Sequence, residues 1–151
     1  MSSLKPAAII AYDLEKAYDL VNRDVLWEIM TAMGYPTLFV DWVKTMYIVT
    51  QLCPLNGNGI VGAVDNCQSV RQGCPLSVHL FALYVEPLLV ALAKGIDGIE
   101  HYGESVKVRA YVDDLVLFVS SLKDICSACE TIMEFCDWTK ARINKGATSY
   151  I

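Results

Sequence analysis

The sequence has little positive charge, and this scarcity limits what the chain can bind by itself. Lysine and arginine total 12 residues against 17 aspartates and glutamates, so the formal net charge is −5. A chain that binds a nucleic acid by itself is expected to have an excess of positive charge, because cationic side chains neutralise the phosphates. The acidic composition therefore argues against a domain that holds nucleic acid alone.

Long apolar runs are also missing. Although 54% of the residues are hydrophobic, no uninterrupted apolar stretch reaches the roughly 18 residues that a membrane-spanning helix needs. The N-terminal apolar run is only a few residues long and leads into acidic residues, so it is a poor secretion signal. We therefore expect no membrane contact and an intracellular location, in the nucleus or the cytoplasm. With 19% charged residues, the composition also excludes a disordered chain.

A complete set of zinc ligands is absent as well. The six cysteines include one pair with C-x-x-C spacing, Cys126 and Cys129, but no second pair follows. The two histidines, His79 and His101, are remote from that pair in the sequence. Structural zinc sites use four such ligands. We therefore expect no zinc site, and reduced, mostly buried thiols.

Strand and helix signals alternate along the chain, and no repeat, low-complexity tract or long linker interrupts them. The length of 151 residues predicts a single domain over residues 1–151. The expected elements, in order, are a strand at 6–13, helices at 22–34 and 36–48, a hairpin around 56–59, a helix at 78–94, a surface loop at 95–104, a hairpin with strands at 106–112 and 115–120, and a helix at 122–140. Asn22 is placed to cap the first helix, and Val78 and Phe81 to share the buried face of the third. This mixture predicts an α+β fold, with helices packed on one face of an antiparallel sheet.

Two adjacent aspartates interrupt the second predicted hairpin. Asp113 and Asp114 lie between strongly apolar strands, and Asp13 ends the first predicted strand in a similar setting. If these strands are neighbours, the carboxylates converge at one edge of the sheet, where they need a compensating cation. Hard oxygen ligands with no nearby His or Cys favour Mg²⁺, and this chemistry indicates phosphoryl transfer.

An ordinary solvated turn is the alternative explanation for Asp113 and Asp114, because aspartate is common in turns. Two features argue against a solvated turn. The flanking residues are strongly apolar, and the tip lacks the Gly, Asn or Pro that usually accompanies a turn aspartate.

Three motifs occur in order: AYDLEKAYDLV at 11–21, RQGCPLS at 71–77 and AYVDDLVLF at 110–118. In this order and at these separations they resemble the palm of a reverse transcriptase, closest to those of non-LTR (LINE-type) retrotransposons. The resemblance spans residues 8 to about 144. It implies an RNA-directed DNA polymerase that extends a DNA primer on an RNA template with dNTPs, using two Mg²⁺ ions, or Mn²⁺ in their place.

Carried over residue by residue, the resemblance makes Asp13 and Asp113 catalytic metal ligands. The Leu14 carbonyl would be an additional metal ligand. Asp114 would assist catalysis by shaping the local field rather than by binding metal continuously.

The resemblance also implies residues that contact the substrates. Tyr18 would lie beneath the incoming sugar and collide with a ribose 2′-hydroxyl; the alternative is an ordinary core tyrosine. Gln72 and Gly73 would bind the nucleotide, with Gly73 allowing close backbone approach. Arg71 would contact a phosphate, unless it is a simple surface arginine. Tyr111 would support the primer terminus, or would equally well pack across the hairpin.

The chain also departs from the family pattern. The segment INKGATSYI at 143–151 resembles the family's I-N-x-x-K-[ST] segment but has Ala147 at the lysine position, with Lys145 as the nearest substitute. The family's basic fingers segment and its thumb would lie outside these 151 residues. We therefore expect a palm fragment that depends on the missing fingers and thumb of a parent polyprotein and is inactive alone.

Two other functions stay open. A non-catalytic remnant of a retroelement, serving as a structural or binding module, is favoured by Ala147. A phosphate-accepting signalling domain also clusters acidic residues around Mg²⁺, but it would need a parallel sheet in which strands alternate with helices.

Overall fold

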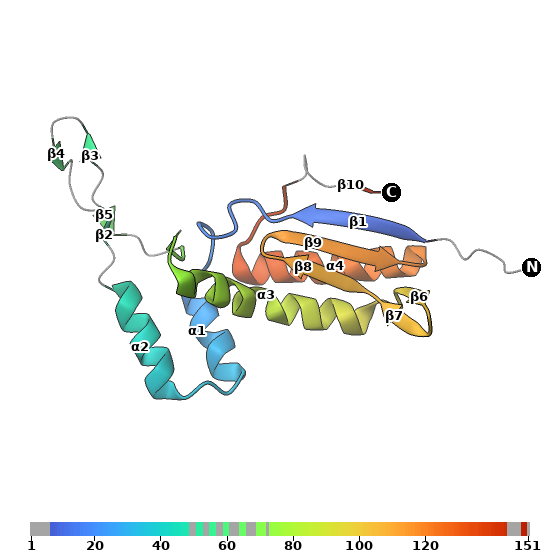
Figure 1. The fold of residues 1–151 in the computed structure, drawn as a ribbon, viewed down its shortest axis with the longest axis horizontal. Helices are drawn as coiled ribbons and strands as arrows, with labels where there is room; N and C mark the ends of the chain where they lie inside the picture. The colour runs from blue at the N-terminus through green and yellow to red at the C-terminus, as the bar shows by residue number, and fades with distance from the viewer. Residues whose placement is uncertain are drawn as a thin grey trace, which may run out of the picture.

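The sheet at the centre of the fold has four antiparallel strands. A computed structural model describes residues 7–48, 51–52, 55–56, 59–60, 64–65, 69–71, 73–144 and 149–150. The strands of the sheet, in spatial order, are β10 (Ser149–Tyr150), β1 (Ala8–Asp13), β9 (Asp114–Val119) and β8 (Val108–Tyr111) (Figure 1). The strand that ends in Asp13 is therefore a neighbour of the hairpin that carries Asp113. The antiparallel pairing excludes the phosphate-accepting signalling domain.

Two helices cover one face of this sheet. α3 (Pro75–Gly95) and α4 (Leu122–Thr139) run side by side along it, with α3 against β8 and α4 against β9 (Figure 1). Strand β9 alternates accordingly, because Leu115, Leu117 and Val119 are buried while the residues between them face the other side of the sheet. α1 (Arg23–Ala32) packs against α3, and α2 (Thr37–Ile48) packs against α1. This arrangement confirms the predicted α+β fold.

The first two helices begin where the sequence predicts. Asn22 caps α1, since its Oδ1 accepts hydrogen bonds from the backbone N–H groups of Asp24 (3.1 Å) and Val25 (3.4 Å). α2 begins directly after Pro36, whose fixed φ suits the start of a helix.

The start of α3 differs from the prediction. The helix begins at Pro75 rather than at Val78. Val78 is 48% exposed, and the buried face is formed instead by residues that include Ser77, Leu80 and Phe81. The placement of Val78 on the buried face was therefore wrong. Ser77, the residue before it, is buried in its place.

Three short antiparallel pairs lie outside the main sheet. They are β2 (Gln51–Leu52) with β5 (Val64–Asp65), β3 (Leu55–Asn56) with β4 (Gly59–Ile60), and β6 (Ile99–His101) with β7 (Glu104–Val106). The pairing of β3 with β4 confirms the hairpin predicted around 56–59. The surface loop predicted at 95–104 is wrong, because β6 and β7 form a hairpin there with Tyr102 and Gly103 at its tip. Both tip residues have positive φ, 48° and 82°, as a type I′ turn requires.

Among the residues that the structure describes, α3 is long and apolar enough to cross a membrane by length and composition alone. In this fold it packs against α1, α4 and β8, as a core helix does. The expectation of no membrane contact stays a prediction.

The cysteines that the structure describes are free thiols. Cys126 is exposed, and Cys74, Cys129 and Cys136 are half-buried, so the expectation of mostly buried thiols is wrong for these four. Cys129 Sγ lies 3.7 Å from the Tyr12 hydroxyl. Burial, reinforced by the hydrogen bond and charge of this cysteine, raises the pKa of Tyr12 to about 12. The tyrosine therefore stays neutral and acts as a packing residue.

Candidate active site

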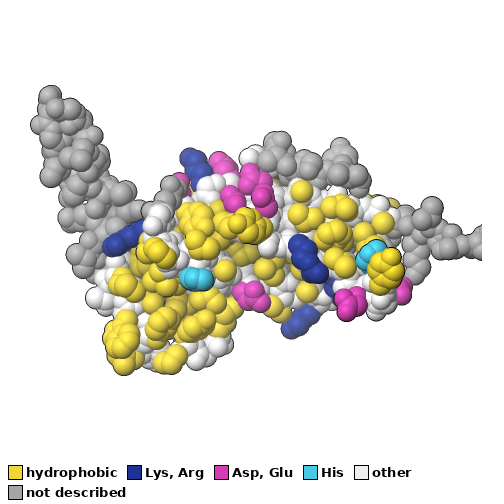
Figure 2. All heavy atoms as spheres, viewed as in Figure 1, with side chains coloured by type: hydrophobic (Ala, Val, Ile, Leu, Met, Phe, Trp, Pro, Cys, Tyr) yellow, Lys and Arg dark blue, Asp and Glu magenta, His cyan; other side chains and the backbone are white. Residues whose placement is uncertain are grey.

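The ends of β1 and β9 bring aspartates together at one end of the sheet. Asp13, the last residue of β1, lies opposite Asp114, the first residue of β9. Residues directly opposite each other in antiparallel strands place their side chains on the same face, with Cβ atoms about 4.5–5.5 Å apart. Since the next residue, Leu115, is buried against the helices, both carboxylates lie on the open face of the sheet. Figure 2 shows acidic side chains gathered at the upper edge of the molecule, near its middle.

A tight turn holds Asp113 beside this pair. Tyr111 pairs with Asp114, so the tip of the β8–β9 hairpin is Val112 and Asp113. The expected tip of Asp113 and Asp114 was wrong by one residue, because strand pairing continues through Asp114. Val112 has a φ of 55°, which a β-branched residue adopts only under strain. The Leu14 N–H donates to the Asp113 carbonyl oxygen at 3.1 Å and fixes the tip against the end of β1.

The segment after α4 holds Asp13 from its other side. The Asn144 side-chain amide donates to Asp13 Oδ2 at 2.9 Å, and the Asn144 backbone N–H donates to the Asp13 carbonyl oxygen at 2.9 Å. Next to them, Leu14 forms an antiparallel bridge with Ile143. In the sequence, this region is marked only by the resemblance of INKGATSYI to a family segment. That resemblance did not identify Asn144 as a site residue, because 131 positions separate it from Asp13.

The donor set at this end of the sheet fits Mg²⁺. In the described part of the chain, no Lys or Arg forms an ion pair with Asp13, Asp113 or Asp114. Carboxylate oxygens and the Leu14 carbonyl are hard ligands that suit this ion. The described residues hold no group of three or more His, Cys, Asp or Glu side chains that could enclose a metal. The site therefore suits a cation that takes one or two protein carboxylates and completes its shell with substrate phosphates and water.

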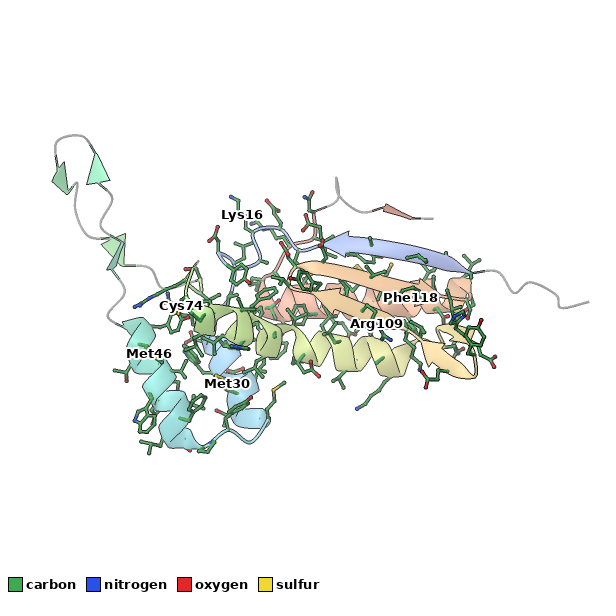
Figure 3. The ribbon with its side chains drawn as sticks, viewed as in Figure 1. Lys16, Met30, Met46, Cys74, Arg109 and Phe118 are labelled. Carbon is green, nitrogen blue, oxygen red and sulfur yellow. The ribbon has the colours of Figure 1, made fainter. Side chains whose placement is uncertain are left out.

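The first two motifs meet at an open hollow beside the start of α3, where Cys74 is labelled in Figure 3. The hollow has a volume of about 550 Å³ and is lined by Tyr18, Arg71, Gly73, Cys74, Pro75, Ser77 and Val78. The Tyr18 ring also packs against Phe81, with 5.2 Å between ring centroids. Tyr18 is thus packed against the core and also borders the hollow, so the choice between a core tyrosine and a residue beneath the incoming sugar stays open. Gly73 has a φ of 81°, which glycine adopts without strain.

Arg71 is exposed but anchored at this hollow. Its Nη2 donates to the Met46 carbonyl oxygen at 2.7 Å, and its guanidinium lies 5.6 Å from the centre of the Tyr47 ring. Arg23 lies over the same ring at 5.1 Å, and the Tyr47 hydroxyl hydrogen-bonds with Ser77 Oγ at 3.2 Å. A solvated surface arginine would have no such fixed position. No pattern in the sequence points to Arg23 or Tyr47, because these contacts join separate helices.

Tyr111 lies on the open face beside the aspartates, since it is the cross-strand partner of Asp114. Its side chain is 80% exposed, so the structure does not support packing across the hairpin. Lys16, in the loop after β1, is exposed and points away from the sheet (Figure 3).

Three residues singled out in the sequence, Gln72, Lys145 and Ala147, lie outside the described residues. The roles expected for them stay predictions.

Comparison with known proteins identifies relatives among transposable elements. A Xenopus laevis protein named Transposon TX1 uncharacterized 149 kDa protein is 32% identical over 144 residues, which cover 94% of this chain and 11% of that protein. The Drosophila melanogaster Retrovirus-related Pol polyprotein from type-2 retrotransposable element R2DM is 29% identical over 133 residues, covering 87% and 12%. The chain thus spans about a tenth of the length of these relatives. Both confirm the resemblance to non-LTR retrotransposons.

Solved structures show the same fold. Telomerase from Candida tropicalis in complex with a TWJ fragment of telomeric RNA superposes with a TM-score of 0.77 at 15% identity, covering 99% of this chain and 27% of that one. Apo telomerase from the same organism, truncated from the C-terminal domain, gives 0.72 at 17% identity, with 97% and 31% covered.

The family pattern described as reverse transcriptase (RNA-dependent DNA polymerase) matches residues 2–150. Enzymes of this family copy nucleic-acid templates and generally use divalent metal ions. Because the match covers almost the whole chain, and the first and third motifs meet at one end of the sheet, this chain belongs to the reverse transcriptase family.

Proposed function

We propose that this chain is the palm of an RNA-directed DNA polymerase of the non-LTR retrotransposon type. The observation that carries the proposal is the pairing of β1 with β9, which sets Asp13 opposite Asp114 on an open sheet face, next to the turn that carries Asp113. Membership of the reverse transcriptase family supports it. The proposed substrates are an RNA template, a DNA primer and dNTPs.

The acidic residues have separable roles in this proposal. Asp13 and Asp113, with the Leu14 carbonyl, bind divalent metal ions, and Asp114 adds negative potential beside them. Mg²⁺, when bound, supplies Lewis acidity that lowers the pKa of the primer 3′-hydroxyl and stabilises the leaving pyrophosphate. The hydrogen bonds to the Asp13 carboxylate and the Asp113 carbonyl keep both residues in place before substrate arrives.

The hollow beside α3 receives the incoming nucleotide. The sugar of this nucleotide lies against the Tyr18 ring, which excludes a ribose 2′-hydroxyl. The base of the nucleotide packs on the backbone at Gln72 and Gly73. Arg71 contacts a phosphate of the template from its anchored position. Tyr111 supports the primer terminus from the open face of the sheet.

The palm depends on other parts of a parent polyprotein for its grip on nucleic acid. The net charge of −5 supplies little attraction for phosphates. In this proposal, fingers and thumb provide the basic surfaces, so the isolated chain gives little or no product in a primer-extension assay on an oligo(dT)-primed RNA template. Robust synthesis that disappears in Asp113→Ala would contradict this inactivity while supporting the catalytic assignment.

Binding of dTTP tests the function without requiring turnover. Isothermal titration calorimetry is expected to show dTTP binding that needs Mg²⁺ and weakens about tenfold or more in Asp13→Asn, because a metal-binding carboxylate is lost. Asp41→Asn is the control, since Asp41 is an exposed aspartate on α2. Binding that is equal in EDTA, or equal in Asp13→Asn and Asp41→Asn, would rule out the proposed site.

A non-catalytic retroelement remnant is the second candidate, favoured by Ala147 at the family's lysine position. It predicts a folded chain that binds neither Mg²⁺ nor dTTP. The same calorimetry therefore distinguishes the two functions.

A further inference from the structure

We propose that Asn144 is a positioning residue that fixes the Asp13 carboxylate for metal binding. The inference rests on the proposed function, because it concerns how that metal site is held. It goes beyond the three aspartates and the Leu14 carbonyl by adding a residue from the far end of the chain.

The geometry at Asn144 separates a backbone role from a side-chain role. Two backbone hydrogen bonds, from Asn144 N–H to the Asp13 carbonyl (2.9 Å) and from Glu15 N–H to the Arg142 carbonyl (2.8 Å), already join this segment to the end of β1. They flank the bridge between Leu14 and Ile143. The bond from the Asn144 amide to Asp13 Oδ2, at 2.9 Å, is additional to this pairing. Closing the strand does not require it.

An amide is chemically suited to this position. A carboxylate offers two oxygens, and a single donor on Oδ2 leaves Oδ1 and the remaining lone pairs for a cation. A lysine or arginine in place of Asn144 would neutralise Asp13 and compete with the metal. Because the amide is uncharged, it fixes the orientation of the carboxylate and preserves its charge. Hydrogen bonds of this kind to metal-binding carboxylates are typically worth 10–100-fold in metal affinity.

Among the described residues, no side chain donates a hydrogen bond to the Asp113 carboxylate as Asn144 does to Asp13. Asp113 is placed by its backbone, through the turn and the Leu14 N–H. Asp13 therefore depends on the Asn144 amide to select one rotamer, and the loss of that amide should affect metal binding more than folding.

Binding of Mn²⁺ to the full 151-residue chain tests the inference, with free Mn²⁺ measured by its electron paramagnetic resonance signal. Asn144→Ala is expected to weaken Mn²⁺ binding about tenfold. Asn22→Ala is the matched control, because it also removes a hydrogen-bonded asparagine side chain, the cap of α1. It should lower the thermal midpoint and leave the Mn²⁺ affinity unchanged.

The outcomes separate this inference from the proposed function. If the wild type binds Mn²⁺ and Asp13→Asn abolishes binding, but Asn144→Ala binds as tightly as the wild type, Asn144 has only a structural role. If the wild type does not bind Mn²⁺, or Asp13→Asn binds normally, the proposed metal site fails and the inference fails with it.

A second variant covers the case in which Asn144→Ala does not fold. Asn144→Asp keeps the shape of the side chain and sets a second carboxylate against Asp13. Its thermal midpoint should rise more on adding Mn²⁺ than that of the wild type, because the cation now relieves a repulsion. An equal rise in both proteins would overturn the inference.

Discussion

The Leu14 N–H donates to the Asp113 carbonyl oxygen at 3.1 Å, so the end of β1 and the β8–β9 turn are held as one unit. This bond comes from backbone atoms and does not depend on a metal. It holds the turn that carries Asp113 beside the end of β1, where Asp13 lies opposite Asp114 and no Lys or Arg of the described residues pairs with these aspartates. Because like charges directly opposite each other destabilise a sheet, the pairing of Asp13 with Asp114 is expected to lower the stability of the protein.

The repulsion between Asp13 and Asp114 predicts that metal stabilises the wild type more than a charge-removing variant. Asp114→Asn should raise the thermal midpoint in EDTA, because like charges directly opposite in a sheet destabilise it. It should also reduce the further rise on adding Mg²⁺, which the wild type is expected to show. Differential scanning fluorimetry with and without Mg²⁺ measures both. Asp137→Asn, an exposed position on α4, should change neither value.

Glycine at position 98 is required by both conformation and space. Gly98 has a φ of 78°, and an added Cβ would lie 2.5 Å from the Val106 carbonyl oxygen and 2.7 Å from Lys107 Cγ. Gly98→Ala should therefore lower the free energy of unfolding by about 2–4 kcal/mol in urea denaturation. Gly103→Ala is the control, because Gly103 has a φ of 82° with nothing within 4 Å of the added Cβ. It should cost only about 1–2 kcal/mol, and equal losses would show that the close contacts do not matter.

A buried carboxylate makes stability depend on pH. Asp124 accepts hydrogen bonds from the backbone N–H groups of Ser120 and Asp97, both at 3.0 Å, and from Ser120 Oγ at 3.1 Å. Burial acts to raise its pKa, but these bonds and one from Gly98 outweigh burial and lower it below the usual value. The stabilisation is therefore present above the unfolded-state pKa of roughly 3.9 and is lost as pH falls through the lower folded-state pKa.

Substitution of Asp124 should remove this pH dependence. Asp124→Asn should lower the free energy of unfolding at pH 7 by about 1–3 kcal/mol, because donors that faced a carboxylate are left poorly matched. Between pH 5 and pH 3 it should lose less stability than the wild type. Urea titrations across this range measure both, and parallel pH profiles would show that another group carries the dependence.

How far the sequence predicts this molecule depends on the range of the interaction concerned. Local signals were sufficient for the strand that ends at Asp13, for the Asn22 cap and for the start after Pro36, since each is set by neighbouring residues. The hairpin at β6 and β7 was missed because its turn is made by Tyr102 and Gly103, a pair without the usual asparagine-glycine signal.

The site shows the same division. The aspartates were found because they interrupt apolar strands, which is visible along the chain. Asn144 and Arg23 were missed because their contacts, to Asp13 and to the Tyr47 ring, exist only after distant segments meet. The motif match at 143–151 marked the segment that carries Asn144 but not its partner, Asp13, and no motif or periodicity marked Arg23.

The exposed face of α2 predicts self-association. Leu38 and Trp42 are 62% and 61% exposed and Met46 is 49% exposed, at a spacing of four residues that puts them on one face. Hydrophobic side chains are exposed over the α2 end of the molecule (Figure 2). Trp42→Glu should therefore raise the solubility limit and shift the gel-filtration profile toward the monomer. Leu122→Glu, at an 80% exposed leucine on a different helix, is the matched control. A wild type that elutes as a clean monomer at high concentration would contradict this prediction.

The position of Tyr18 predicts how the proposed nucleotide site discriminates between sugars. Its ring is held against Phe81 at 5.2 Å and borders the hollow beside Gly73, so a ribose 2′-hydroxyl would meet a ring that cannot move aside. In calorimetry with Mg²⁺, the wild type should prefer dATP to ATP, and Tyr18→Ala should bring the two affinities close together. Tyr18→Phe keeps the ring and should keep the preference. If Tyr18→Ala folds and retains the wild-type preference, the sugar is selected elsewhere and Tyr18 is only a core residue.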